Sequence, residues 1–361
     1  MTRQNPAREA GGREFGGVWF PAVRAGTGAD VFTLRLSEAL TRRHVRNELT
    51  WLPHRAEYAP WTVTAPPPPN WASIIHVNNW LHARFYARSG LPVLATCHSC
   101  VHDPAIAPYK TYAQSLYHRG WIQPVESTTL LHAGCVTAVS RYTAARMTEV
   151  FGRSEIEVVP NWLPSSAFVP PQRAAHREPF RLLYVGAWRR AKGSDLLVPI
   201  MKKLGPRFEL GFTGTPPKAI ELPANMRPLG WSSDPAQVRE WMRKADALLF
   251  PSRLEGMSLA VLEAMACGLP VIATDCTSLP ELITHGANGL LCPTDNVNAF
   301  AAAAERLHAN PAEWVAMQEA AFARAKTFHT EEAAVESYLA LYSELIERTH
   351  LSDHNTHGNS P

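Results

Sequence analysis

The stretch 252–268, SRLEGMSLAVLEAMACG, holds the residues whose types and spacing best suit chemistry on an anionic ligand. Gly256 allows the backbone to approach a ligand closely, and Ser258 is a favourable N-cap for a following helix. The free N–H groups at such a helix start suit a phosphate. Glu255 lies in the loop, and Glu263 is the single charged side chain of the run 259–267. We therefore predict an anion site framed by two carboxylates.

Glu263 needs a donor if its helix is buried, because an unpaired buried charge is costly. Ribose hydroxyls are one such donor. The alternative is a glutamate on a narrow solvent-facing strip, or one paired with an arginine.

The elements around this stretch place it at a sheet edge. A short apolar run, 247–250, is ended by Pro251, and a second run, 270–274, follows Gly268. This order predicts a strand, a loop, a helix and a parallel strand with a right-handed crossover. The loop and the helix start then lie at the carboxyl edge of the sheet, where ligands bind.

The string PSRLEGMSLAVLEAMACGLPVIAT, followed by SLPELITHGANGLL, resembles the retaining nucleotide-sugar glycosyltransferases called glycosyl transferases group 1, or family 4. The shared pattern is a glutamate, seven residues, a second glutamate and then Ala-Met-Ala-Cys-Gly-Leu-Pro-Val. The resemblance implies an α/β chain of GT-B architecture. Two Rossmann-like doubly wound domains would face each other across a cleft, and the C-terminal helix would cross back to the first domain.

The first turn of the second domain, GAWRRAKG at 186–193, matches the family in part. In the family an arginine directly after the glycine and a lysine five residues on clamp the donor diphosphate. Lys192 matches the lysine, but Ala187 occupies the arginine position, so Arg189 or Arg190 would have to reach in from the same loop. An ordinary solvated basic turn is the alternative. On the second domain the resemblance implies donor binding at Arg189, Arg190, Gly230, Ser252, Gly256, Met257, Ser258, Leu259 and Glu263.

Two regions of the first domain also match the family in part. His98 follows a predicted strand at 92–96, where the family places a histidine that contacts the donor sugar. The loop GTGAD, with Gly26 and Gly28, stands where the family has a glycine-rich loop near the donor diphosphate, although one residue separates its glycines. A plain turn before a helix is the alternative for this loop, and an ordinary histidine is the alternative for His98.

The resemblance implies a retaining reaction in which the leaving diphosphate takes the acceptor proton. Glu255 would orient sugar hydroxyls, Glu263 would hold the ribose, and His98 would contact the sugar. Because no Asp-x-Asp metal-ligand pair occurs in the sequence, Lys192 and the helix start would stabilise the diphosphate, which predicts metal independence and no cofactor. The partners would be a nucleotide-sugar donor and a glycan, glycolipid or small-molecule hydroxyl acceptor, with lipid-linked acceptors among the candidates.

Two other functions stay open. A nucleotide-sugar 2-epimerase of the same fold would convert the donor without an acceptor. A non-catalytic nucleotide-sugar-binding homologue would retain the fold alone, and Ala187 in place of the expected arginine is the sequence feature that favours it.

Composition describes a soluble globular protein. The chain has 361 residues, enough for two domains, with 46% hydrophobic and 19% charged residues. A net charge of +3 is too small to indicate nucleic acid binding. The first residues lack an apolar leader segment, which predicts a cytoplasmic protein, at most peripheral at the inner face of the membrane through Arg42, Arg43 and Arg46. A solvated helix face is the preferred interpretation of those arginines.

The six cysteines favour reduced thiols. The cluster of Cys97, His98, Cys100 and His102 has metal-like spacing but lacks a second ligand pair, so we expect no metal there.

For the domain organisation we expect a first domain at 1–168, a linker at 169–178 and a second domain at 179–328. A crossover helix at 329–350 and a disordered tail at 351–361 would follow. We also expect a helix near 81–88, and a capping box in which Ser278 and Glu281 begin another helix.

Overall fold

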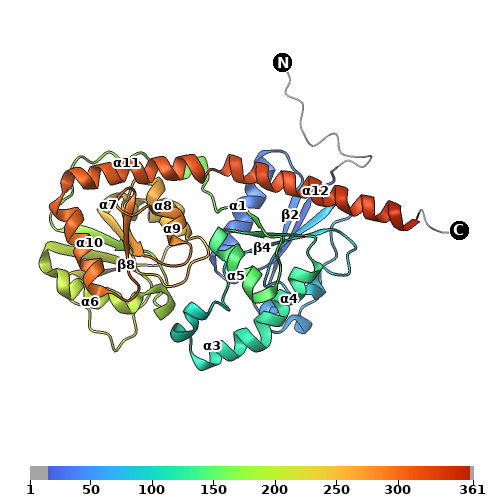
Figure 1. Ribbon diagram of the computed structural model, residues 1–361, viewed down its shortest axis with the longest axis horizontal. Helices are drawn as coiled ribbons and strands as arrows, with labels where there is room; N and C mark the ends of the chain where they lie inside the picture. Colours follow the sequence, from blue (N-terminus) through green and yellow to red (C-terminus); the bar gives the residue numbers. More distant parts are fainter. Residues whose placement is uncertain (1–14, 358–361) are drawn as a thin grey trace, which may run out of the picture. The chain divides into compact units, whose positions relative to one another are not determined.

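The computed structural model describes residues 15–357, and these form two α/β units. The first unit holds residues 15–103, 111–160 and 332–357, and the second holds 104–110 and 161–331. Figure 1 shows both units, with the chain coloured from blue to red.

The first unit is built on a parallel sheet in the order β2-β1-β3-β4-β5-β6. Its register is set at β1, where Val18 is the partner of both Asn47 and Ile74. The inner strands are short apolar runs, as expected for a parallel sheet covered on both faces. The strands are β1 (Val18–Val23), β2 (Asn47–Leu52), β3 (Ile74–Asn78), β4 (Val93–Cys97), β5 (Cys135–Ala138) and β6 (Glu157–Val158).

The helices of the first unit cover this sheet, and the last helix of the chain packs among them. His76 of β3 bonds Tyr342 of α12 through Nδ1 (2.6 Å), and Phe32 of α1 packs edge-on against Tyr338 of α12. The expected return of the C-terminal helix to the first domain is therefore confirmed (Figure 1). The helices are α1 (Gly28–Arg42), α2 (Arg55–Tyr58), η2 (Pro60–Thr62), η3 (Ala83–Phe85), α3 (Tyr112–Tyr117), the π-helical η5 (His118–Ile122), α4 (Gln123–His132), α5 (Arg141–Phe151) and α12 (Glu331–His357).

The second unit repeats the design with a parallel sheet in the order β12-β11-β10-β7-β8-β9. The chain reverses its direction of travel across the sheet between β7 and β10, which is the switch point where ligands bind in such folds. The strands are β7 (Phe180–Tyr184), β8 (Phe208–Thr213), β9 (Met226–Gly230), β10 (Ala247–Phe250), β11 (Val271–Thr274) and β12 (Gly289–Cys292).

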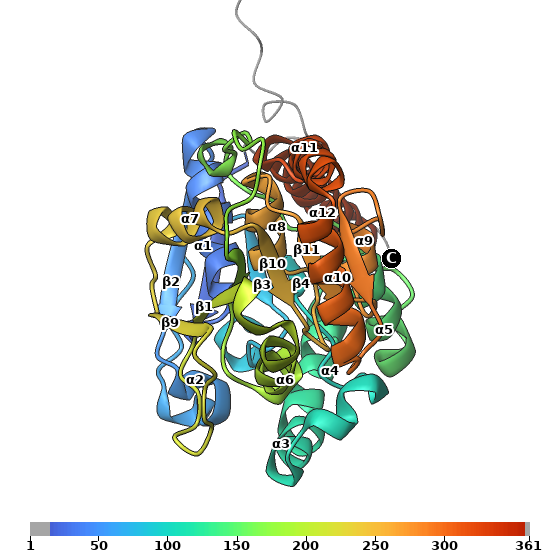
Figure 2. The same ribbon diagram turned by 90° about the vertical axis from the view of Figure 1, so that its left-hand side faces the viewer.

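Helices lie on both faces of this second sheet. The helix α6 packs beside α10 on one face, while α8 contacts α7 and α11 on the other (Figure 2). Together with the first sheet this confirms the expected GT-B class of fold. The helical segments are η4 (Pro104–Tyr109), η6 (Ser165–Ala167), η7 (Arg190–Lys192), α6 (Ser194–Leu204), η8 (Gly205–Arg207), α7 (Pro235–Lys244), α8 (Leu259–Ala266), α9 (Leu279–Leu282), α10 (Val297–Ala309) and α11 (Pro311–Phe328).

The boundaries between the units differ from those expected. The chain passes to the second unit after Pro160, and residues 169–178 belong to that unit. Arg173, in the expected linker, binds the buried carboxylate of Asp246 and the carbonyl of Ala245, which ties the segment down.

Two local expectations about helices are wrong. The segment 81–88 forms only the 3-10 turn η3, because the chain turns at Tyr86 instead of continuing. The last helix continues to His357, since neither proline nor glycine interrupts it before Gly358. The remainder of the expected disordered tail, 358–361, lies outside the described residues.

The arginines at the end of α1 contact the protein itself. Arg43 pairs with Glu336 (3.6 Å) and bonds the carbonyl of Glu332, and the Arg46 guanidinium lies 4.5 Å from the ring centre of Trp71. These contacts give two of the three arginines a structural role. Among residues 15–357, no helix combines the length and the apolar character that crossing a bilayer requires.

Candidate functional site

The second unit brings Lys192 and Glu255 together at the carboxyl edge of its sheet. Lys192 Nζ lies 2.7 Å from Glu255 Oε1, and the Ser252 hydroxyl donates to the same oxygen at 2.6 Å. Glu255 is buried, while the Lys192 side chain keeps 38% of its surface exposed. An ammonium has three N–H donors, so Lys192 can bind Glu255 and still offer hydrogen bonds to a ligand from solvent.

Close backbone contact holds these two residues at this distance. Gly193 ends the turn η7 with a φ of +69°, and a Cβ at this position would lie 1.9 Å from the carbonyl oxygen of Pro251. The N–H of Arg253 donates to the carbonyl of Ala191 (2.9 Å), which joins the same two loops. Glycine is therefore required at 193 for the loop that carries Lys192 to meet the loop that carries Glu255.

The start of α8 has the expected N-cap. The Ser258 hydroxyl accepts from the N–H of Val261 at 3.4 Å, and Leu259 begins the helix. Gly256 and Met257 are buried just before it, and the Met257 carbonyl accepts from Asn161. Glu263, in the middle of α8, is half-buried, so it is not enclosed to the degree that the apolar sequence predicted.

Ser278 does not act as the predicted helix cap. Its hydroxyl donates to the carbonyl of Glu255 (3.1 Å), and α9 is only four residues long with no side-chain cap. The Thr277 hydroxyl accepts from the N–H of Glu255 (3.3 Å). The backbone of Glu255 is therefore fixed at both its N–H and its C=O by the loop after β11.

Arg253 is a buried cation that the sequence did not reveal. It bonds Asp195 through both terminal nitrogens (2.7 and 3.0 Å) and Asp295 through Nε (2.6 Å), and it also donates to the carbonyl of Arg190. Burial lowers its pKa, but the hydrogen bonds and charges of Asp195 and Asp295 outweigh this and the net shift is upward. Arg253 is thus committed to the protein and positions the loops that carry Lys192 and Glu255.

Tyr109 covers this arginine. The guanidinium lies 4.5 Å from the ring centre of Tyr109, whose hydroxyl donates to Asp295 at 2.6 Å. This contact explains why the segment 104–110 groups with the second unit.

The remaining predicted donor positions of this unit lie at its surface. Ala187, Arg189 and Arg190 are exposed in the first turn. Gly230 ends β9 at the sheet edge with a φ of +81°. The structure brings Arg189 and Arg190 into the same turn as Lys192, but no described hydrogen bond fixes either guanidinium.

In the first unit, His98 is held as a neutral imidazole. Its Nε2 lies 2.8 Å from Asn78 Oδ1, so Nε2 carries the proton, and Phe32 packs edge-on against the ring at 4.6 Å. Burial lowers the pKa of His98 to about 3. A neutral His98 acts as a hydrogen-bonding group rather than as a cation.

The loop with Gly26 and Gly28 is closed by its own side chains. Asp30 Oδ2 accepts from the N–H groups of Ala25 (2.9 Å) and Gly26 (2.8 Å). Gly26 has a φ of +71°, and Gly28 is the first residue of α1. The Gly26 amide is thus already bonded, which favours the plain turn, and a donor contact at Gly26 or Gly28 stays a prediction.

The cysteines are all free thiols in the described chain, as expected. Burial raises the pKa of Cys97 well above its usual value and that of Cys100 to about 11. Both thiols are therefore protonated and poorly reactive at neutral pH.

Comparison with known protein families supports the glycosyltransferase resemblance of the sequence motifs. Residues 179–310 match the model of the family described as glycosyl transferases group 1, and residues 30–166 match that of glycosyltransferase family 4. The two matches, one on each half of the chain, together support a group 1 glycosyltransferase. The match over residues 179–310 covers Lys192, Glu255 and the whole of α8.

Curated relatives of this family resemble the chain over part of their length. A D-inositol 3-phosphate glycosyltransferase of Pseudarthrobacter chlorophenolicus is 30% identical over 55% of this chain and 53% of its own length. An enzyme of the same name from Xylanimonas cellulosilytica is 27% identical over 77% of this chain and 73% of its own. The alignment thus spans about half of the first relative and almost three quarters of the second.

Solved structures of other proteins share the fold. A sucrose-phosphate synthase from Thermosynechococcus elongatus superposes with a TM-score of 0.73 at 21% identity, over 91% of this chain and 98% of that chain. The Anabaena protein Alr3699/HepE, solved in complex with UDP-glucose, superposes with a TM-score of 0.70 at 14% identity, over 91% and 99%.

Proposed function

We propose that this chain transfers a sugar from a nucleotide-diphosphate sugar to a hydroxyl acceptor, with retention of configuration and without a metal ion. The observation that carries the proposal is the contact of Lys192 with Glu255 beside the start of α8. A lysine, a carboxylate and free helix N–H groups are the chemistry that a sugar diphosphate requires.

Lys192 stabilises the negative charge that develops on the leaving diphosphate as the glycosidic bond breaks. The N–H groups at the start of α8 add to this stabilisation through the positive end of the helix dipole. Arg253 is neutralised by two aspartates. This chain has Ala187 where the family has an arginine, so the exposed Arg189 and Arg190, in the same turn as Lys192, are the cations that remain for that role.

Glu255 orients the sugar hydroxyls, and its fixed surroundings support that role. The Ser252 hydroxyl and Lys192 share Oε1, and the backbone is held by Thr277 and Ser278. The second carboxylate oxygen of Glu255, Oε2, is then the atom that accepts a hydrogen bond from a sugar hydroxyl. Glu263 would hold the ribose, and His98 would meet the sugar as a neutral hydrogen-bonding group.

The named relatives suggest where to begin the search for substrates. Two curated relatives are named as glycosyltransferases of D-inositol 3-phosphate, and one structural neighbour binds UDP-glucose. A panel of UDP-, GDP- and ADP-sugars, each with inositol phosphate, simple sugars and lipid-linked acceptors, would be assayed for released nucleoside diphosphate. The anomeric configuration of the product, read by NMR, tests retention, and turnover in EDTA tests metal independence.

Variants tie the activity to the site. Lys192→Ala should lower kcat by about a hundredfold to a thousandfold, as for the loss of one charge-stabilising donor, and Glu255→Gln should do the same. Lys203→Ala, an exposed lysine at the end of α6, is the matched control and should turn over normally. Wild-type kcat in both site variants would refute the assignment, and sugar conversion without an acceptor would show an epimerase instead.

A further inference from the structure

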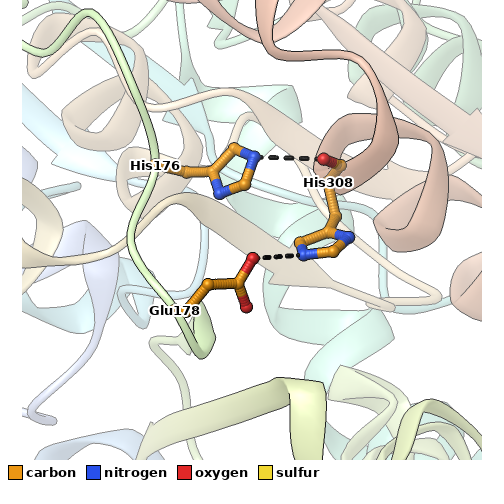
Figure 3. A group of neighbouring side chains, drawn as sticks. All are labelled: His176, Glu178 and His308. Atoms are coloured by element: carbon orange, nitrogen blue, oxygen red, sulfur yellow. Dashed lines mark hydrogen bonds and ion pairs between the residues drawn. The ribbon is translucent and has the colours of Figure 1, made fainter.

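A second cluster of chemistry-bearing side chains lies at the opposite edge of the second sheet, outside the proposed donor site. His176 and Glu178 precede β7, and His308 lies in the last turn of α10. Their ligand atoms all lie within 4.8 Å of one another (Figure 3). The strand β7 runs from this edge toward Gly186, so the cluster and the turn that carries Lys192 lie at opposite ends of the strand.

Hydrogen bonding fixes the tautomer of His176. Its Nε2 lies 3.0 Å from the carbonyl oxygen of His308, and a carbonyl can only accept, so Nε2 carries a proton. In the neutral ring Nδ1 then presents a lone pair. This Nδ1 is buried and has no hydrogen-bond partner among the described residues. Figure 3 shows it on the side of the ring that faces Glu178.

The other two groups complete a three-sided set. His308 Nε2 and Glu178 Oε1 lie 2.7 Å apart, and the Glu178 side chain is 65% exposed. The ring of His176 is held by packing against Phe180 (5.2 Å) and Trp314 (5.9 Å). A fixed imidazole, a second imidazole and a movable carboxylate are therefore gathered around one space.

We propose that His176 Nδ1, His308 Nε2 and Glu178 bind one divalent transition-metal ion of the Zn²⁺ type. Two imidazoles and a carboxylate suit Zn²⁺, with water as the fourth ligand. The N–H of His176 that donates to a backbone carbonyl is the outer-shell contact that metal-binding histidines typically make. His308 would bind through Nε2 with its own proton on Nδ1.

The geometry needs only small side-chain movements. Tetrahedral ligands about 2.0–2.1 Å from Zn²⁺ stand roughly 3.3 Å apart, so His308 and Glu178 must separate slightly, and the cluster must close around the ion. The exposed Glu178 can make that adjustment. The bound ion would tie the segment before β7 to the end of α10, which are 130 residues apart in the sequence, and so stabilise the second unit.

The experiment is calorimetric titration of the untagged full chain with ZnCl₂, together with thermal unfolding in Zn²⁺ and in EDTA. Histidines 350, 354 and 357 are a separate source of metal affinity, so all three are changed to Gln in every sample. We expect one Zn²⁺ per chain and a rise in Tm with Zn²⁺ that EDTA reverses.

Glu178→Gln and His308→Gln should each weaken Zn²⁺ binding by at least about tenfold, because even loss of an outer-shell partner has that effect. They should also abolish the Zn²⁺-dependent shift in Tm. The matched control is His54→Gln, which removes a histidine from a His–Glu pair that has no third ligand within reach among residues 15–357, and it should bind Zn²⁺ as the parent does.

Two results would overturn the proposal. One is the absence of stoichiometric binding in the parent chain, which is expected if His176 instead carries a second proton toward Glu178. The other is binding that persists in both site variants. The cluster and Lys192 lie at opposite ends of β7 and share no residue, so failure here leaves the proposed function standing, and loss of transfer in Lys192→Ala leaves this site standing.

Discussion

The two units use polar groups at their sheet edges in opposite ways. In the second unit the charges of Lys192, Glu255 and Arg253 are kept and paired, and Lys192 still reaches solvent. In the first unit burial keeps the imidazoles of His76 and His98 neutral. His76 lies in the core between the hydroxyls of Tyr342 (2.6 Å) and Thr96 (2.7 Å).

This difference follows from burial. Burial lowers the pKa of His76 to about 3, with a smaller contribution from the nearby His98. The hydrogen bonds described for His76 and His98 go to no carboxylate, whereas Lys192 and Arg253 of the second unit each have an acidic partner within 3 Å. The second unit therefore presents paired charges at its sheet edge, whereas His76 and His98 of the first unit present neutral hydrogen-bonding groups.

The sharpest way to break the charged site is to separate its two loops without removing a charge. Gly193→Ala places a Cβ against the Pro251 carbonyl, so the backbone must shift and Lys192 moves away from Glu255. We expect kcat to fall about a hundredfold, because small displacements of catalytic groups have effects of that size.

The matched control for that variant lies in the first unit. Gly152 has nearly the same backbone angles, φ 71° and ψ 10°, but open space around its Cβ position. Gly152→Ala should lose only the ~1–2 kcal/mol of left-handed strain and keep its turnover. Equal losses of kcat in the two variants would show that backbone strain, not contact with Pro251, explains the effect.

Arg253→Met tests whether the buried cation positions the site. The variant loses hydrogen bonds to Asp195, to Asp295 and to a carbonyl, and we expect unfolding in urea to show a loss of about 2 kcal/mol. We also expect kcat to fall more than KM rises, because Lys192 and Glu255 keep their charges but lose their alignment.

Arg227→Met is the corresponding control, since Arg227 makes an exposed ion pair with Glu209 and should change stability by less than about 0.5 kcal/mol. Wild-type kcat in Arg253→Met would show that the cation serves stability alone.

The neutral network of the first unit is tested by pH. The unfolded chain protonates His76 near its usual pKa of about 6.5, whereas the folded chain does so only near 3. The stabilisation that depends on the neutral His76 ring is therefore complete above pH 6.5. It is lost as the pH falls from 6.5 towards 3, by about 1.4 kcal/mol per pH unit. His76→Gln keeps a hydrogen-bonding side chain but cannot titrate, so its unfolding free energy should fall less steeply between pH 6.5 and 5. Parallel slopes would contradict a neutral His76.

Much of this comparison was predictable from the sequence, because the signals for it are local. Short apolar runs located the strands near 92–96, 247–250 and 270–274, a contiguous motif located Glu255 and Ser258, and the partial match at 186–193 located the turn with Lys192. The strand β12 was missed because it begins with Gly289, which resembles a turn. Ser278 was misassigned because a capping-box pattern does not reveal the competing carbonyl of Glu255.

What could not be predicted depends on contacts between distant residues. Arg253 meets Asp195 and Asp295 across 58 and 42 residues, and no local pattern marks any of the three as partners. The cluster of His176, Glu178 and His308 is likewise assembled across about 130 residues. Side chains that position a site from outside its motif therefore required the fold.

The smallest expected effect concerns Tyr109, whose contacts with Arg253 and Asp295 hold the segment 104–110 against the charged site. Its hydroxyl donates to Asp295 at the surface, and this bond raises the pKa of Tyr109. Tyr109→Phe keeps the ring over Arg253 and removes only the hydrogen bond, so overall stability should change by less than about 1 kcal/mol. The segment itself should loosen, and trypsin should cleave after Lys110 a few times faster than in the parent. Tyr109→Ala also removes the ring and should increase cleavage further, whereas equal cleavage in all three proteins would show that Ile106, buried in the same segment, is what holds it.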